Sequence, residues 1–148
     1  MIRKYKEVDL EILMKIWGEA SVLAHPFLED EFVQKVTQDM RQIYLPNPEA
    51  NTYVYKENEN IVGFISMIEN EIAGLFVNPK NCSKGIGSAL VNYVQEKGYD
   101  ILEVEVFKNN EIGRAFYDKY GFKKINEYFF EAANQNVLRM RYVKKNIK

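Results

Sequence analysis

Residues 72–94 constrain the fold of this 148-residue chain more than any other stretch. The apolar run Ile72 to Val77 has the composition of a strand, and Pro79 stops it, because proline cannot donate a hydrogen bond to a sheet. The sequence Gly85-Ile86-Gly87 follows in a polar loop, and apolar residues then recur at helical spacing up to Val94. Strand, glycine loop and helix start in this order are typical of a phosphate-binding arrangement.

The physical basis of such a site is the start of the helix. The first helical turn leaves backbone N–H groups unpaired at the positive end of the helix dipole. Glycines without a Cβ let phosphates approach the main chain, and Lys84 adds a positive charge. Two glycines in a loop are nevertheless more often plain turn residues, so this motif alone leaves both interpretations open.

Periodicity along the whole chain predicts a single α+β domain, residues 1–148. The elements follow the order β α α β β β α β α β β. They form a mixed, mostly antiparallel seven-stranded sheet flanked by about four helices. The strand–helix–strand unit around the glycine loop makes its two strands parallel. The predicted strands are 2–6, 51–55, 61–68, 72–77, 101–106, 123–131 and 136–143, and the predicted helices begin after Asp9 as N-cap and at 29, 86 and 112.

Composition excludes several classes of protein. The net charge of −1 leaves no electrostatic footprint for nucleic acid. The N-terminal residues lack the apolar segment of a signal peptide, and no apolar run approaches the ~20 residues of a membrane span, so we expect a cytoplasmic protein without a membrane partner. One histidine and one cysteine cannot build a zinc site, so no metal is expected. Exposed edge strands are compatible with a monomer or a homodimer.

A second motif lies about 25 residues after the glycine loop, separated from it by one helix and one strand. It reads Asn110-Glu111-Ile112-Gly113-Arg114-Ala115-Phe116-Tyr117-Asp118-Lys119-Tyr120-Gly121-Phe122. With Val77-Asn78-Pro79 and Cys82-Ser83-Lys84-Gly85-Ile86-Gly87, it resembles the two blocks of the Gcn5-related N-acetyltransferase (GNAT) family. The resemblance covers essentially the whole chain. Two positions depart from it: Cys82 stands where the family usually has Arg or Gln, and Gly113 where it has Ala.

The resemblance implies acetyl-CoA as co-substrate. Its pyrophosphate would rest on the backbone of residues 83–88, and its pantetheine arm would pair with the strand before the loop. Its sulfur would lie over Gly113 against Tyr117. Asn110 matches a cofactor-contacting position and is equally a plain helix cap. The implied cofactor-binding residues are Leu75, Phe76, Val77, Cys82, Ser83, Lys84, Gly85, Ile86, Gly87, Ser88, Asn110, Gly113 and Tyr117.

Acetyl transfer to an amine needs an acid and a base. A phenol with a pKa of about 10 keeps its proton at neutral pH and can give it to the departing thiolate, which makes Tyr117 the candidate acid. In this family a carboxylate near the start of the cofactor-binding strand often deprotonates the amine, which makes Glu71 the candidate base. The alternative is that Glu69 and Glu71 are solvated turn residues. His25 can bind or deprotonate the acceptor, or serve only as a helix-capping or packing residue.

The resemblance also implies that the acceptor binds between the loop after the first helix and the strand near residue 128. The candidate acceptor-binding residues are His25, Phe27, Glu69 and Tyr128. Along 128–130 only one alternating face can line a pocket, so either Tyr128 and Phe130 or Phe129 alone should do so. We expect an N-acetyltransferase that transfers directly from acetyl-CoA to a primary amine, with a small-molecule acceptor favoured. The alternatives are a peptide or protein acetyltransferase, acting on an N-terminus or a lysine, and a non-catalytic acyl-CoA-binding module.

Overall fold

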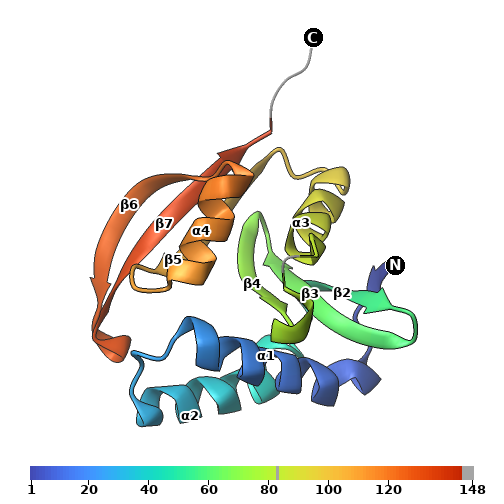
Figure 1. The fold of residues 1–148 in the computed structure, drawn as a ribbon, viewed down its shortest axis with the longest axis horizontal. Coiled ribbons are helices and arrows are strands. Elements are labelled where there is room, and N and C mark those ends of the chain that lie inside the picture. The colour runs from blue at the N-terminus through green and yellow to red at the C-terminus, as the bar shows by residue number, and fades with distance from the viewer. Residues whose placement is uncertain (83, 145–148) are drawn as a thin grey trace.

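The computed structural model describes residues 1–82 and 84–144. Within these residues, seven strands form one sheet in the order β1-β2-β3-β4-β5-β7-β6 (Figure 1). The strands are β1 (Ile2–Lys4), β2 (Asn51–Glu57), β3 (Asn60–Ile68), β4 (Glu71–Val77), β5 (Ile101–Phe107), β6 (Lys123–Phe130) and β7 (Gln135–Val143). The helices are α1 (Leu10–Ala24), α2 (Asp30–Asp39), α3 (Ile86–Glu96) and α4 (Glu111–Tyr120). Single turns are η1 (Glu7–Asp9), η2 (Met40–Tyr44), η3 (Pro79–Asn81) and η4 (Glu131–Ala133). The predicted α+β class and element order are confirmed.

The sheet opens between its two parallel strands. All neighbouring strands are antiparallel except β4 and β5, which pair at only two positions, Glu71 with Glu103 and Ile72 with Val104. β5 pairs along all seven of its residues with β7, whereas β4 stays with β3. The sheet therefore divides past Ile72, which leaves one edge of β4 without a strand partner.

Helices cover both faces of the sheet and create two cores. Alternation along β3 sends Phe64 to the core under α1 and Ile65 to the core under α3. The same alternation along β5 buries Leu102, Val104 and Val106 on the α3 side, so that Glu103 and Glu105 point to the opposite face. The buried face of α3 is formed by Ile86, Leu90, Val91 and Val94, as its spacing predicts.

Two local expectations need correction. Asp9 precedes α1, but its carboxylate does not cap that helix; it accepts hydrogen bonds from the Arg3 guanidinium and from the Lys6 N–H at 2.8 Å. The second predicted helix ends as an α-helix at Asp39 and continues to Tyr44 as a π-helical turn. Among the described residues, no helix has both the length and the apolar character needed to cross a membrane.

Candidate active site

A cavity of about 870 Å³ lies where β4 and β5 separate. Its wall includes Val104 and Val106 from one face of β5 and Glu105 from the other. Because neighbouring residues of a strand point to opposite faces, the cavity passes through the sheet. The N-terminal end of α3 and one side of α4 line it on one face, and the last turn of α1 lines it on the other. Two substrates can therefore reach each other from opposite faces.

Most of the cofactor-binding residues expected from the sequence line this one cavity. The exceptions are Lys84, whose Nζ lies 3.7 Å from a Glu57 carboxylate oxygen, and Ser83, which lies outside the described residues. The cavity-lining members are Leu75, Phe76, Val77, Cys82, Gly85, Ile86, Gly87, Ser88, Asn110, Gly113 and Tyr117.

Glycine is required at the two loop positions, 85 and 87, for different structural reasons. Gly85 has φ +79°, a left-handed conformation that side chains disfavour, and it starts α3. A Cβ on Gly87 would lie 3.0 Å from the ring of Phe116, so this glycine lets α3 approach α4 closely. Within the described residues no side chain caps the start of α3. Its first N–H groups therefore remain available to an anion.

Tyr117 presents its phenol to the cavity from α4. The side chain is 7% exposed, and burial raises the pKa of its hydroxyl, with no hydrogen bond from a described residue contributing to the shift. Tyr120, one turn away on the same wall, differs in this respect. Its hydroxyl donates to Asn92 Oδ1 at 2.6 Å and accepts from the Gln95 amide. Of these two cavity-lining tyrosines, Tyr117 is therefore the one whose hydroxyl has no hydrogen-bond partner among the described residues.

Asn110 joins the start of α4 to the end of α1. Its Oδ1 accepts a hydrogen bond from the Gly113 N–H at 2.8 Å and so caps α4, and its Nδ2 lies 3.1 Å from His25 Nε2. Burial lowers the pKa of His25 to about 4, so the imidazole is neutral at pH 7. Asn110, Gly113, Tyr117 and His25 all line the cavity.

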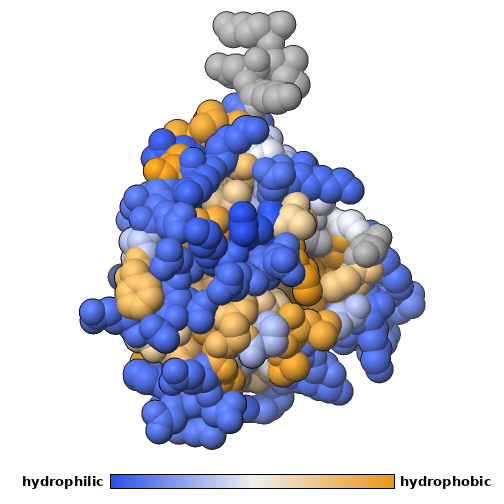
Figure 2. Space-filling view, turned by 60° about the vertical axis from the view of Figure 1, so that its left-hand side comes forward, coloured by the Kyte–Doolittle hydropathy of each residue, from blue (hydrophilic) through white to orange (hydrophobic). Residues whose placement is uncertain are grey.

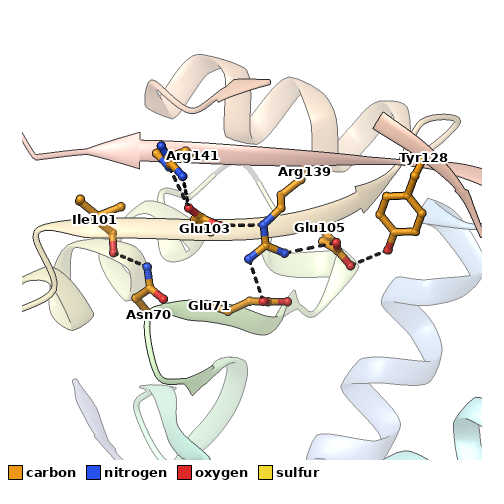
Figure 3. Close-up of polar contacts among 8 residues, drawn as sticks. All are labelled: Asn70, Glu71, Ile101, Glu103, Glu105, Tyr128, Arg139 and Arg141. Carbon is orange, nitrogen blue, oxygen red and sulfur yellow. Dashed lines mark hydrogen bonds and ion pairs between the residues drawn. The ribbon is translucent and has the colours of Figure 1, made fainter. Parts of the chain in front are cut away.

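Glu71 is absent from the cavity wall that the described residues form. Figure 3 shows it as part of an ionic network on the sheet face opposite α3 and α4. Arg139 of β7 lies at the centre of this network and donates to Glu71 on β4 and to Glu103 and Glu105 on β5, at 3.1, 2.7 and 3.2 Å. Arg141 donates a further hydrogen bond to Glu103, and the two arginines hold the pKa of the Glu103 carboxyl below its usual range.

Glu105 is a cavity-lining residue that the sequence reasoning missed. One of its oxygens accepts a hydrogen bond from the Tyr128 hydroxyl at 2.8 Å, and the other lies 3.2 Å from Arg139. Burial and this hydrogen bond raise the pKa of Tyr128 to about 12. The strict alternation of 102–106 predicts that Glu105 faces away from the α3 core, but not that β4 leaves it beside an opening.

Phe27, Glu69 and Tyr128 do not contribute to the cavity wall formed by the described residues. Phe27 packs edge-on against the rings of His25 and Phe107, which do line it. Glu69 lies in the turn between β3 and β4 with φ 52°. The expected pocket face of residues 128–130 is not found, because β6 is the edge strand and all three aromatic side chains are more than a third exposed.

The fold and the site define an acetyltransferase. The sheet opens between two parallel strands, and the described residues leave the start of α3 without a side-chain cap and the Tyr117 hydroxyl without a hydrogen-bond partner. Residues 7–144 match the model of the acetyltransferase (GNAT) domain, and the chain belongs to this family. Membership confirms the enzyme class and the acyl-CoA co-substrate that the two sequence motifs predict.

Relatives and solved structures agree with this assignment. The chain is 33% identical over 123 residues, 82% of each sequence, to the peptidyl-lysine N-acetyltransferase YiaC of Escherichia coli K12. The spermidine N(1)-acetyltransferase of Thermoplasma acidophilum is 25% identical over 140 residues, 82% of this chain and 87% of that protein. The solution structure of YjaB from Escherichia coli superposes with a TM-score of 0.86 at 26% identity over 98% of each chain. The Thermoplasma acidophilum PaiA N-acetyltransferase in complex with coenzyme A superposes at 0.77, with 21% identity and 96% and 98% coverage.

Proposed function

We propose that this protein transfers the acetyl group of acetyl-CoA directly to a primary amine inside the cavity between β4 and β5, with Tyr117 as general acid. The observation that carries the proposal is the Tyr117 hydroxyl, which has no hydrogen-bond partner among the described residues and belongs to a cavity-lining side chain. The N-terminus of α3 lines the same cavity. The amine nitrogen forms a bond to the thioester carbon and the carbon–sulfur bond breaks. The ammonium form of the amine loses one proton to a base before it attacks, and the departing thiolate takes a proton from Tyr117. The nitrogen loses its second proton after the new bond has formed, and this proton restores the Tyr117 phenol.

The high pKa of Tyr117 does not conflict with this role. Burial raises it by penalising the charged phenolate. A thiolate that forms in the same desolvated cavity is penalised for the same reason. Whether the proton moves from the phenol to the thiolate therefore depends on the difference between the pKa values of the two groups in the cavity. The phenol remains protonated until the sulfur departs.

Backbone groups hold the co-substrate in this proposal. The pyrophosphate binds the first N–H groups of α3, at the positive end of the helix dipole. The pantetheine amide pairs with the edge of β4 that has no strand partner past Ile72. Gly113 and Tyr117, four residues apart on α4, share the face on which the sulfur lies.

Glu105 is the preferred base in this proposal, ahead of Glu71. Both carboxylates contact Arg139, but Glu105 is among the described residues that line the cavity and Glu71 is not. Glu105 also faces the side of the sheet covered by α1, from which the acceptor enters. Tyr128 and Arg139 orient its two oxygens, and a carboxylate in this position attracts a cationic amine before it accepts the proton.

The acceptor class that we propose is the side-chain amine of lysine in a peptide or protein. The sequence favours a small molecule, but the 33%-identical relative is named a peptidyl-lysine N-acetyltransferase. An exposed apolar rim, which includes Leu23 of α1 on the cavity wall at 57% exposure, suits a polypeptide partner. Hydrophobic side chains also gather in the middle of the surface in Figure 2, between hydrophilic regions. A small polyamine is the second candidate, because the 25%-identical relative is named a spermidine acetyltransferase.

The variant Tyr117→Phe tests the acid. We expect kcat to fall about 10²-fold while the Kd for acetyl-CoA changes less than about twofold, since only the proton donor is lost. Tyr93→Phe is the matched control, because Tyr93 of α3 packs against Tyr53 of β2, is not among the described residues that line the cavity, and loses the same atom. Coenzyme A release is measured with lysine peptides and with spermidine in parallel. Undiminished turnover by Tyr117→Phe removes the residue from the mechanism, and binding of acetyl-CoA without turnover on any amine favours the non-catalytic module.

A further inference from the structure

We infer that His25 is a positioning residue, whose neutral Nε2 accepts a hydrogen bond from Asn110 and thereby holds the first turn of α4, which carries Tyr117, against the end of α1. This inference rests on the proposed role of Tyr117. It replaces the expectation that His25 is the base or contacts the acceptor.

The orientation of the Asn110 amide follows from its other partner. The Gly113 N–H is only a donor, so the atom 2.8 Å away must be the carbonyl oxygen of Asn110. The NH₂ group therefore faces His25 at 3.1 Å. Since that NH₂ group is only a donor, His25 Nε2 must be an unprotonated acceptor, and the ring proton lies on Nδ1.

Gly113 makes this geometry possible. A Cβ at this position would lie 2.6 Å from Asn110 Nδ2 and 3.0 Å from its Cγ. Such contacts would rotate the amide and break the bond to the Gly113 N–H or the one to His25. The departure from the family motif at residue 113 and the bond between His25 and Asn110 are therefore one structural feature.

His25 is itself held firmly from the side of α1. Its backbone N–H donates to Ser21 O at 2.8 Å at the end of that helix. Its ring packs edge-on against Phe107 and Phe27, with centroid distances of 5.2 and 5.9 Å. Burial among these rings lowers its pKa to about 4, consistent with a neutral ring. With Nε2 occupied by Asn110 and Nδ1 protonated, His25 has no free lone pair to accept a proton from the amine.

The chain of contacts crosses the opening in the sheet. α1 lies on one face, α4 on the other, and residues 25 and 110 meet across the cavity. The cap on Gly113 sets the start of α4, and Tyr117 follows one turn later on the same face. Loss of the acceptor on His25 frees the Asn110 amide to rotate, so α4 loses a fixed start and Tyr117 loses its alignment with the reacting sulfur.

The first test is spectroscopic and needs no activity. His25 is the single histidine of the chain, so its imidazole ¹⁵N signals are unambiguous. Between pH 5.5 and 8 we expect a neutral ring protonated on Nδ1, and Asn110→Ala should shift the Nε2 signal. A ring that is protonated on Nε2, or positively charged at pH 6.5, overturns the inference whether or not the protein acetylates any amine tested.

The second test is kinetic and uses two variants. His25→Phe keeps an aromatic ring but removes the acceptor, and we expect kcat to fall about 10- to 100-fold with little change in the KM for acetyl-CoA. His25→Gln places an acceptor oxygen near the position of Nε2 and should recover kcat to within about threefold of wild type. Thermal unfolding checks that both variants are folded. Equal kcat losses in the two folded variants, or no loss in His25→Phe, contradict a positioning role. If wild type turns over no amine, the proposed function fails, and the ¹⁵N measurement still decides the hydrogen bond.

Discussion

Glu71 and Glu105 are both glutamates, but they differ in their position relative to the cavity. Both contact Arg139, but Glu105 lies on the cavity wall and Glu71 lies in the first residue pair that joins β4 to β5. A base must reach the acceptor nitrogen, directly or through one water, so position decides between them before pKa does. Because a residue at a strand start can face either a turn or a site, the sequence could not separate the two.

The pair Glu105→Gln and Glu71→Gln tests this assignment at the residue scale. We expect Glu105→Gln to lower kcat/KM about 10- to 100-fold at pH 7, since it removes both the base and a charge that attracts the amine. The loss should shrink as pH rises towards the acceptor pKa, where the amine is already deprotonated. Glu71→Gln should cause the smaller loss at every pH. Rate measurements from pH 6.5 to 9.5 compare the two, and the reverse order would identify Glu71 as the base.

The β4–β5 pair has the fewest paired positions of the described strand pairs, and the proposed function depends on the opening beside it. Two paired positions join these strands, and Arg139 bridges them from β7 through Glu71, Glu103 and Glu105. Figure 3 shows the guanidinium lying across β5 with the three carboxylates around it. Hydrogen bonds between side chains thus hold the strands together at the base of the opening, where the backbone pairing ends.

Arg139→Gln should destabilise the protein by about 1–2 kcal/mol, because three carboxylates lose their shared cation in a partly exposed site. Arg141→Gln is the matched control on the same strand, since Arg141 contacts Glu103 alone among these carboxylates and should cost less. The contacts with arginine lower the folded-state pKa of Glu103, so their stabilisation is present above the unfolded pKa of about 4.3 and is lost as pH falls below it.

The difference between wild type and Arg139→Gln should therefore be full at pH 7 and shrink below about pH 4.3. Urea unfolding at several pH values measures it. Equal destabilisation by the two arginine variants would mean that Arg139 does not act as the bridge between β4 and β5.

On the scale of the whole molecule, the sheet is divided, and under the proposed function the co-substrate binds where it divides. β1 to β4 form one antiparallel part and β5 to β7 another (Figure 1), and the core under α3 contains residues from both parts. The cavity between them is lined from both parts and from three helices. A ligand bound there contacts both parts at once, so binding and stability are coupled.

Acetyl-CoA at about 100 times its Kd should stabilise the protein by about 2.7 kcal/mol and raise the Tm. Hydrogen exchange should slow most in β4 past Ile72, whose edge facing β5 has no strand partner among the described residues. Thermal unfolding and exchange mass spectrometry, with adenosine diphosphate as a control for phosphate binding alone, measure the two effects. Stabilisation without protection of β4 would place the ligand outside the opening.

Local patterns in the sequence predict a large part of this structure. Period-two alternation and the positions of glycine and proline are short-range signals, which is why the order of elements and the face of 101–106 that carries Glu103 and Glu105 can be predicted. The second motif adds the start of α4 at Asn110 and the position of Tyr117 on its face. These features depend on neighbours within about one helical turn or one strand.

The features that the sequence did not predict depend on contacts between residues far apart in the chain. The place where β4 leaves β5 brings Glu105 to the cavity and leaves Glu71 with Arg139, 68 residues away. The order of strands makes β6 an edge, which exposes the aromatic residues expected in a pocket. The bond between His25 and Asn110 spans 85 residues. The sequence by itself determined the elements, because these follow from local periodicity, and the kind of chemistry, because its two motifs resemble those of the GNAT family. Only the tertiary structure decided which glutamate lines the cavity and which side chain His25 contacts, because both depend on contacts that form when the sheet assembles and divides.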